Sequence, residues 1–228
     1  MISRFELFSK RDDMSMEDFV KMMNEHAEIE KKALNLRGLV HTVINDHNQD
    51  HPLARGPVEV DGYSELVFDS LKDMEEGIAS ISEEEKAHRA KFCPDHKTLI
   101  CAKKFDKEVP PEYKNFPLLK RMSFLSLGQD ITPARFQHEW WGLHSDLVKR
   151  MPGQMAYAQN LVIDALIDGK AVKYEELPVA GVVEFWYKDQ TDFKACFAGP
   201  DFVHTRTHGA EFLGGVTTNM GYEVIYDI

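Results

Sequence analysis

Cysteines, basic tracts and long apolar segments are all scarce in this chain of 228 residues. The three cysteines have no metal-binding spacing and cannot all pair with one another, so we expect reduced intracellular thiols. The formal net charge of −11 argues against nucleic acid or an anionic membrane surface as a partner. No apolar run approaches the length of a transmembrane helix and no signal segment opens the chain, so we expect a cytoplasmic protein without a membrane partner.

Motifs for cofactors and metals are missing as well. The sequence has no glycine-rich phosphate loop, no nucleophile elbow and no paired-cysteine site, so we expect no cofactor. Two histidine pairs have i, i+4 spacing, His47 with His51 and His204 with His208. Each pair supplies too few ligands alone, and the first lies in a loop rich in proline and glycine, so we expect no metal site.

What the chain does contain is a long internal repeat. Gly62-x-x-Glu65 and Gly181-x-x-Glu184 each open an apolar stretch, at an offset of 119 residues. Two further matches follow the same order: Phe19 with Phe136, and the pair Gly38 and Asn45 with the pair Gly153 and Asn160. The unit is too long for a solenoid repeat, so we interpret it as a duplicated small domain.

Hydrophobic periodicity and capping signals predict the same order of elements in both halves. The predicted strands lie at 4–9, 39–44, 64–68, 98–105, 121–127, 155–163, 182–187 and 223–228. The predicted helices begin at Ser15, Asp73, Ser82, Pro133, Asp192 and Asp201.

These elements predict an α+β fold made of two tandem ferredoxin-like repeats, each with the order βαββαβ. The repeats cover residues 1–107 and 118–228, and the proline-rich segment 108–117 links them because proline continues neither helix nor strand. The two sheets would pack together as an internal pseudo-dimeric α/β barrel. One chain then closes its own barrel, and a homodimer is optional.

Two histidines lie on the apolar stripe of the first helix of each half. His144 follows Phe136 by eight residues and Trp140 by four, whereas His26 follows Phe19 by seven. A histidine held between a helix and a sheet can act as a general acid or base near neutral pH. The alternative is a hydrogen-bonded core histidine, and the difference in spacing leaves that alternative open.

Polar side chains recur on the strands too. Asn45 and Asn160 each end the second predicted strand of their half, where an amide can donate to a substrate carbonyl or complete a turn. Glu65 and Glu184 lie in otherwise apolar strands, where a carboxylate can orient a histidine or form a salt bridge. The aromatic side chains of the second half can line a ligand cavity or simply fill the core: Trp140, Trp141, Tyr157, Trp186 and Tyr187.

In this order, the motifs resemble the EthD family. The second copy of the pattern consists of Phe136, Trp140, His144, Pro152, Gly153, Tyr157, Asn160, Glu184 and Trp186. The first copy consists of Lys10, Arg11, Phe19, Asn45, Glu65, Phe68 and Asp69. In it Met23 replaces the tryptophan and His26 is displaced by one position. The family belongs to the dimeric α/β-barrel superfamily, so the resemblance implies ferredoxin-like subunits with a cavity between sheet and helices.

Residues and resemblance together favour a cofactor-independent lyase, dehydratase or isomerase that acts on a small apolar carbonyl compound, aromatic or lactone-like. His144 and His26 would be the general acid or base of their halves. The expected substrate-binding residues are Asn160, Asn45, Trp140, Tyr157, Trp186 and Glu184. The rival hypothesis is a non-catalytic ligand-binding or accessory protein that uses the same cavity.

Overall fold

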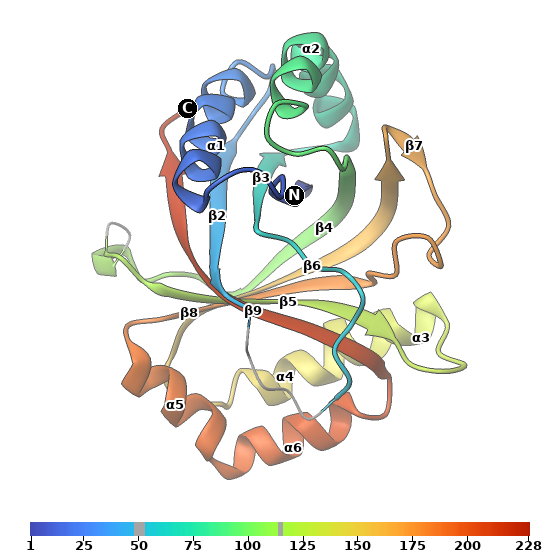
Figure 1. Ribbon diagram of the computed structural model, residues 1–228. Helices are drawn as coiled ribbons and strands as arrows, with labels where there is room; N and C mark the ends of the chain where they lie inside the picture. The colour runs from blue at the N-terminus through green and yellow to red at the C-terminus, as the bar shows by residue number, and fades with distance from the viewer. Residues whose placement is uncertain (48–52, 114–115) are drawn as a thin grey trace.

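An eight-stranded antiparallel barrel forms the centre of the molecule. The computed structural model describes residues 1–47, 53–113 and 116–228. The strands follow the order β4-β1-β3-β2-β9-β5-β8-β6, and β6 pairs with β4 to close the barrel. Figure 1 shows α1 and α2 on one side of the barrel and α4, α5 and α6 on the opposite side. The mixed α/β barrel confirms the coarse fold prediction.

The first half forms six elements, and their order is the predicted one. They are β1 (Ile2–Phe8), α1 (Met16–Glu30), β2 (Gly38–Asp46), β3 (Gly62–Phe68), α2 (Leu71–Arg89) and β4 (Lys97–Lys107). Ser15 caps α1 by accepting a hydrogen bond from the Asp18 amide. The prediction of a separate helix from Ser82 is wrong, because α2 continues through it and buries Ile81 and Glu85 on one face.

A short 3-10 helix, η1 (Pro111–Tyr113), lies between the halves. The second half forms β5 (Leu119–Leu127), α3 (Pro133–Gln137), η2 (His138–His144), α4 (Ser145–Val148), β6 (Gln154–Ile167), β7 (Lys170–Ala171), β8 (Gly181–Tyr187), α5 (Gln190–Ala198), α6 (Pro200–Gly209) and β9 (Leu213–Tyr226). The last strand was predicted to begin at Glu223. It begins ten residues earlier because β9 pairs with β5 in its first part and with β2 in its last.

Strand register shows which residues of the two halves correspond. Phe5 of β1 lies opposite Glu65, and Met122 of β5 lies opposite Glu184. Arg4 and Arg121, the preceding residues, therefore occupy equivalent positions on the barrel. Glu6 and Ser123, the following residues, do so as well.

The same reasoning corrects the predicted asparagine pair. Val40 of β2 lies opposite Glu65, and Ala158 of β6 lies opposite Glu184. Two residues further on, Thr42 and not Asn45 corresponds to Asn160. Asn45 is exposed beside an irregularity in the pairing of β2 with β9, so its spacing from Gly38 was a coincidental match.

The mismatch in histidine spacing has a structural cause. Residues His138–His144 form a π-helix between α3 and α4. A π turn accommodates one more residue than an α turn, so it takes up the extra residue between Phe136 and His144. His26 and His144 therefore lie at equivalent places.

Candidate functional site

A cavity of about 70 Å³ lies between the barrel and the helices of the second half. Strand β5 contributes Arg121 and Ser123 to its wall, and η2 contributes His144. Its remaining lining is largely apolar and aromatic and includes Trp140, Tyr157, Phe185 and Phe197. An apolar cavity with a few converging polar groups is the usual form of a small-molecule site.

His144 belongs to a chain of polar contacts that starts at a carboxylate. Glu139 Oε2 lies 3.3 Å from Nε2 of His208, which belongs to α6. The Nδ1 atoms of His208 and His144 lie 3.2 Å apart, and their rings stack. Glu139, His208 and His144 therefore form a relay that ends at the cavity.

The carboxylate of Glu139 determines which ring nitrogen of each histidine in the relay carries a proton. Because ionised Glu139 only accepts hydrogen bonds, Nε2 of His208 carries a proton and its Nδ1 accepts in the neutral ring. His144 then donates from Nδ1, which leaves its Nε2 unprotonated. Among the described residues, no hydrogen-bond partner occupies that nitrogen. The arrangement thus leaves a free imidazole nitrogen in a cavity wall.

The charge state of His144 agrees with this assignment. Burial, followed by repulsion from His208, lowers the pKa of His144 to about 3. The imidazole is therefore neutral at pH 7. A neutral histidine can accept a proton, although a pKa so far below neutrality makes it a weak base while the cavity is empty.

Arg121 is a buried cation in the same wall. Its side chain donates one hydrogen bond, from Nη2 to Oγ1 of Thr218 at 3.3 Å, and lies 4.8 Å from the Phe197 ring centre. Within residues 1–47, 53–113 and 116–228, no carboxylate forms an ion pair with it. Burial lowers its pKa, although an arginine in a protein remains protonated.

Tyr157 supplies a polar atom without a partner. Its side chain is fully buried and lines the cavity, and the described residues give its hydroxyl no hydrogen bond. Burial raises the pKa of Tyr157 well above its usual value, so the group keeps its proton. It is therefore available as a donor to a ligand.

Comparison with known protein families gives a match for a segment that contributes most of the cavity lining. Residues 128–215 match the EthD domain family. This segment of the second half is similar to an EthD domain. This match confirms the resemblance found in the second copy of the motif, and no curated protein sequence matches the chain.

Solved structures share the barrel over nearly the whole chain. An anthrone oxidase-like protein aligns with a TM-score of 0.65 at 10% identity, over 98% of this chain and 91% of its own. A candidate monooxygenase from Fusobacterium nucleatum aligns with a TM-score of 0.65 at 10% identity, covering 99% and 94%. A candidate monooxygenase from Lactobacillus acidophilus reaches 0.57 at 10% identity, covering 99% of both chains. At this identity the similarity establishes the fold alone.

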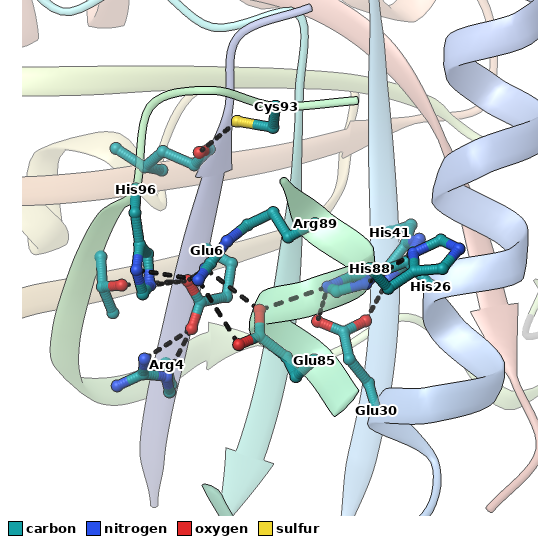
Figure 2. A network of polar contacts seen from close by, with 12 residues as sticks. Arg4, Glu6, His26, Glu30, His41, Glu85, His88, Arg89, Cys93 and His96 are labelled. Carbon is teal, nitrogen blue, oxygen red and sulfur yellow. Dashed lines mark hydrogen bonds and ion pairs between the residues drawn. The ribbon is translucent and has the colours of Figure 1, made fainter. Parts of the chain in front are cut away.

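Outside the EthD-like segment, the first half repeats the histidine pair. The Nδ1 atoms of His26 and His88 lie 3.3 Å apart in stacked rings, as those of His144 and His208 do. Here, however, carboxylates surround Nε2 of His26, with Glu85 at 3.5 Å and Glu30 at 3.8 Å. Figure 2 shows this network of charged side chains around His26 and Glu6.

The carboxylates reverse the acid–base properties of the first-half histidine. Burial alone would lower the pKa of His26, but Glu85 and Glu30 outweigh it and raise the pKa. The same neighbours leave little space beside the ring, which is fully buried. His26 therefore favours the protonated state inside an ion network, whereas His144 is a neutral group on a cavity.

The other predicted binding residues lie apart from the cavity. Glu184 accepts a hydrogen bond from Asn160 at 2.9 Å and pairs with Lys120 at 2.6 Å. These side chains are fully buried on the side of the strands that faces the barrel interior, and the side chains of Lys103 and Glu65 beside them are nearly so. Burial alone would raise the pKa of Glu184, but Lys120 and Lys103 lower it to about 2.

Trp186 lies in a third place, near the linker, where it donates a hydrogen bond from Nε1 to Glu223 at 2.8 Å. Of the predicted binding residues, the structure thus brings together His144, Trp140 and Tyr157 on one cavity. It does not bring Asn160, Asn45, Glu184 or Trp186 there. Glu184 does not orient a histidine; Glu139 contacts His208 instead.

His208, Glu139 and Arg121 were not predicted. A signal for His208 existed, since it follows His88 by 120 residues, close to the repeat offset. Of the two histidine pairs considered for metal binding, His51 lies outside the described residues. The part of the chain that the structure describes holds no group of three or more metal-ligating side chains arranged for an ion. No helix within it is long and apolar enough to cross a membrane.

Proposed function

We propose that the second half binds a small apolar carbonyl compound and that His144 removes a proton from the carbon next to the carbonyl. The observation that carries this proposal is the relay from Glu139 through His208 to His144, which leaves Nε2 of His144 free at the cavity. The products would follow by isomerisation or by loss of a leaving group. Proton transfer of this kind needs no cofactor.

Charge development explains how a weak base can act here. Removal of the proton creates an enolate next to the new imidazolium, and the attraction between them raises the proton affinity of His144. Apolar walls strengthen that attraction because they exclude water. The protonated hydroxyl of Tyr157 is the group best suited to donate to the substrate carbonyl, the task earlier predicted for Asn160 and Asn45.

We further propose that the two halves are tandem ferredoxin-like repeats divided at 1–107 and 118–228. Equivalent strand registers and equivalent histidine pairs support this division. The family model matches within the second repeat alone. The proposed relationship of the first half to the second therefore rests on their equivalent strand registers and histidine pairs. Since the single chain closes the barrel, a homodimer would be an addition to the fold and not a condition for it.

The names of the structural relatives, anthrone oxidase-like and monooxygenase, support a small organic substrate but do not select the reaction. The rival function is ligand binding without catalysis, which needs the cavity but not the relay. The two differ in whether a carbon-bound proton is exchanged.

The test is hydrogen–deuterium exchange into a panel of cyclic ketones and lactones in D₂O, followed by NMR. Exchange detects proton abstraction whatever product forms later. We expect His144→Ala to slow exchange by roughly 10²- to 10⁴-fold, the usual effect of losing a general base. His26→Ala should leave the rate nearly unchanged, with thermal melts confirming that both variants fold. Equal rates for His144→Ala and the unmodified protein would leave ligand binding as the function.

A further inference from the structure

Arg4 and Arg121 occupy equivalent positions but differ in their neighbours. In the first half, Arg4 pairs with Glu6 at 2.6 Å, two residues along the same strand. The residue equivalent to Glu6 on β5 is Ser123, whose hydroxyl bonds to Thr218. The arginine is thus retained while its carboxylate is missing.

The helices of the second half have likewise lost the acidic side chains that the first half carries. Counting from the equivalent histidines, Glu30 corresponds to Val148, Glu85 to Thr205 and Arg89 to Gly209. In the first half these three residues form the ion network around His26 and Glu6. In the second half their three counterparts, together with Ser123, all line the cavity.

These replacements leave the cavity with a positively charged lining. None of its described lining residues is acidic, whereas Arg121 lies in its wall and the exposed Arg206 at its rim. This contrasts with a chain whose formal net charge is −11. A buried cation without a counter-ion is costly, and an anion at its side removes that cost.

We infer that the cavity binds an organic anion, with a carboxylate against Arg121 and an apolar or aromatic skeleton against Trp140, Tyr157 and Phe185. The carboxylate takes the role that Glu6 fills for Arg4 in the first half. A planar guanidinium suits a carboxylate because it can donate two parallel hydrogen bonds. As a description of the substrate this inference rests on the proposed function, but binding itself does not depend on turnover.

A bound carboxylate also affects the base. A negative charge close to His144 favours its protonated form and would move its pKa upward from about 3, toward the range in which a general base is effective. Other groups that face the ring are His208 from α6 and, across the cavity, Arg121 from β5. Neither of these groups is an anion, so the ligand would supply the negative charge that the cavity lining lacks.

The test compares benzoate with benzamide, which has the same shape but no charge, by isothermal titration of the whole protein. We expect benzoate to bind about 10- to 100-fold more tightly than benzamide, the range for hydrogen bonds to a charged group. Arg121→Gln should abolish this preference and Arg121→Lys should retain part of it. Arg135→Gln, a change at an exposed arginine of α3, should leave it unchanged.

Ser123→Glu reproduces the first half in the second. We expect the introduced carboxylate to pair with Arg121 and remove the preference for benzoate, whereas Ser123→Gln, equal in size, keeps it. Equal affinity for benzoate and benzamide, or no saturable binding of benzoate, would overturn the inference. Selective benzoate binding without deuterium exchange in the ketone panel would retain the anion site and remove the catalytic function.

Discussion

Gly181 lies so close to the indole ring of Trp140 that a Cβ at this position would come within 2.6 Å of ring carbon Cζ3. Gly62 has the same relationship to Met23, with 3.1 Å to its sulfur. The glycines that begin the repeated Gly-x-x-Glu motif are therefore points of close contact between the first helical segment of each half and the sheet. Trp140 then fixes one wall of the cavity.

Gly181→Ala should destabilise the protein by about 1–3 kcal/mol, because the added methyl group displaces a rigid ring in a packed core. Urea unfolding followed by circular dichroism measures this. Gly142→Ala is the matched control, since a Cβ there meets nothing within 4 Å. Equal stability of the two variants would mean that the indole ring is free to move.

The two buried histidines should give stability opposite dependences on pH. The pKa of His144 is lowered to about 3, so the unfolded chain binds the proton first and stability falls as pH drops below about 6.5. The pKa of His26 is raised, so its contribution is complete below about 6.5 and is lost as pH rises through the folded value.

Urea unfolding at several pH values, with His144→Gln and His26→Gln beside the unmodified protein, separates the two contributions. The stability advantage over His144→Gln should shrink on acidification, by up to about 1.4 kcal/mol per pH unit. The advantage over His26→Gln should shrink on alkalinisation. Parallel curves for the two variants would contradict the assigned charge states.

Lys120→Met should cost about 3–5 kcal/mol, because Glu184 and Glu65 must then share Lys103 and one charge in the barrel interior is uncompensated. The ammonium group is fully buried and lies 2.6 Å from Glu184. Lys149→Met removes an exposed ion pair with Asp146 and should cost less than about 1 kcal/mol. A loss at Lys120 no larger than at Lys149 would show that water reaches the cluster.

Glu139→Gln should lower the deuterium-exchange rate without preventing folding, since Glu139 acts on His144 through His208. We expect a loss of about tenfold, together with an altered pH profile, because the proton arrangement of the relay is no longer fixed. Arg37→Gln removes an exposed ion pair with Asp69 in the first half, away from the relay, and serves as the control. An unchanged pH profile would show that Glu139 has no positioning role.

A structural feature of this protein was predictable where its physical constraint produced a recognisable pattern in the sequence. The glycine and glutamate of the repeated motif correctly aligned β3 with β8, because close helix contact and barrel register constrain both positions. Spacing from Gly38 and Gly153 misaligned Asn45 with Asn160, because the two glycines are not equivalent. Gly153, with a φ of 79°, corresponds to Asn35, which has a φ of 61° in the first half. The π-helix that ends at His144 leaves no signal in hydrophobic periodicity. The sequence alone therefore does not align His26 with His144.

The barrel interior was the least predictable part. Alternation on β8 shows that Glu184 and Phe185 face opposite sides, but it cannot show that the polar side lies inside a closed barrel. Glu184 therefore looked like a surface or site residue, whereas Lys103 and Lys120 reach it from β4 and β5. Such pairing between distant strands depends on closure, which only the full set of strand contacts determines.

Closure of the barrel within one chain has an evolutionary consequence. In a barrel made of two identical subunits, every substitution enters both sides at once. Here the seams β2–β9 and β4–β6 join two halves that are encoded separately, so a substitution changes one side alone. One half can accumulate buried ion pairs that stabilise the fold while the other half keeps its cavity. A symmetric dimer cannot acquire this difference by point mutation, because each mutation changes both subunits.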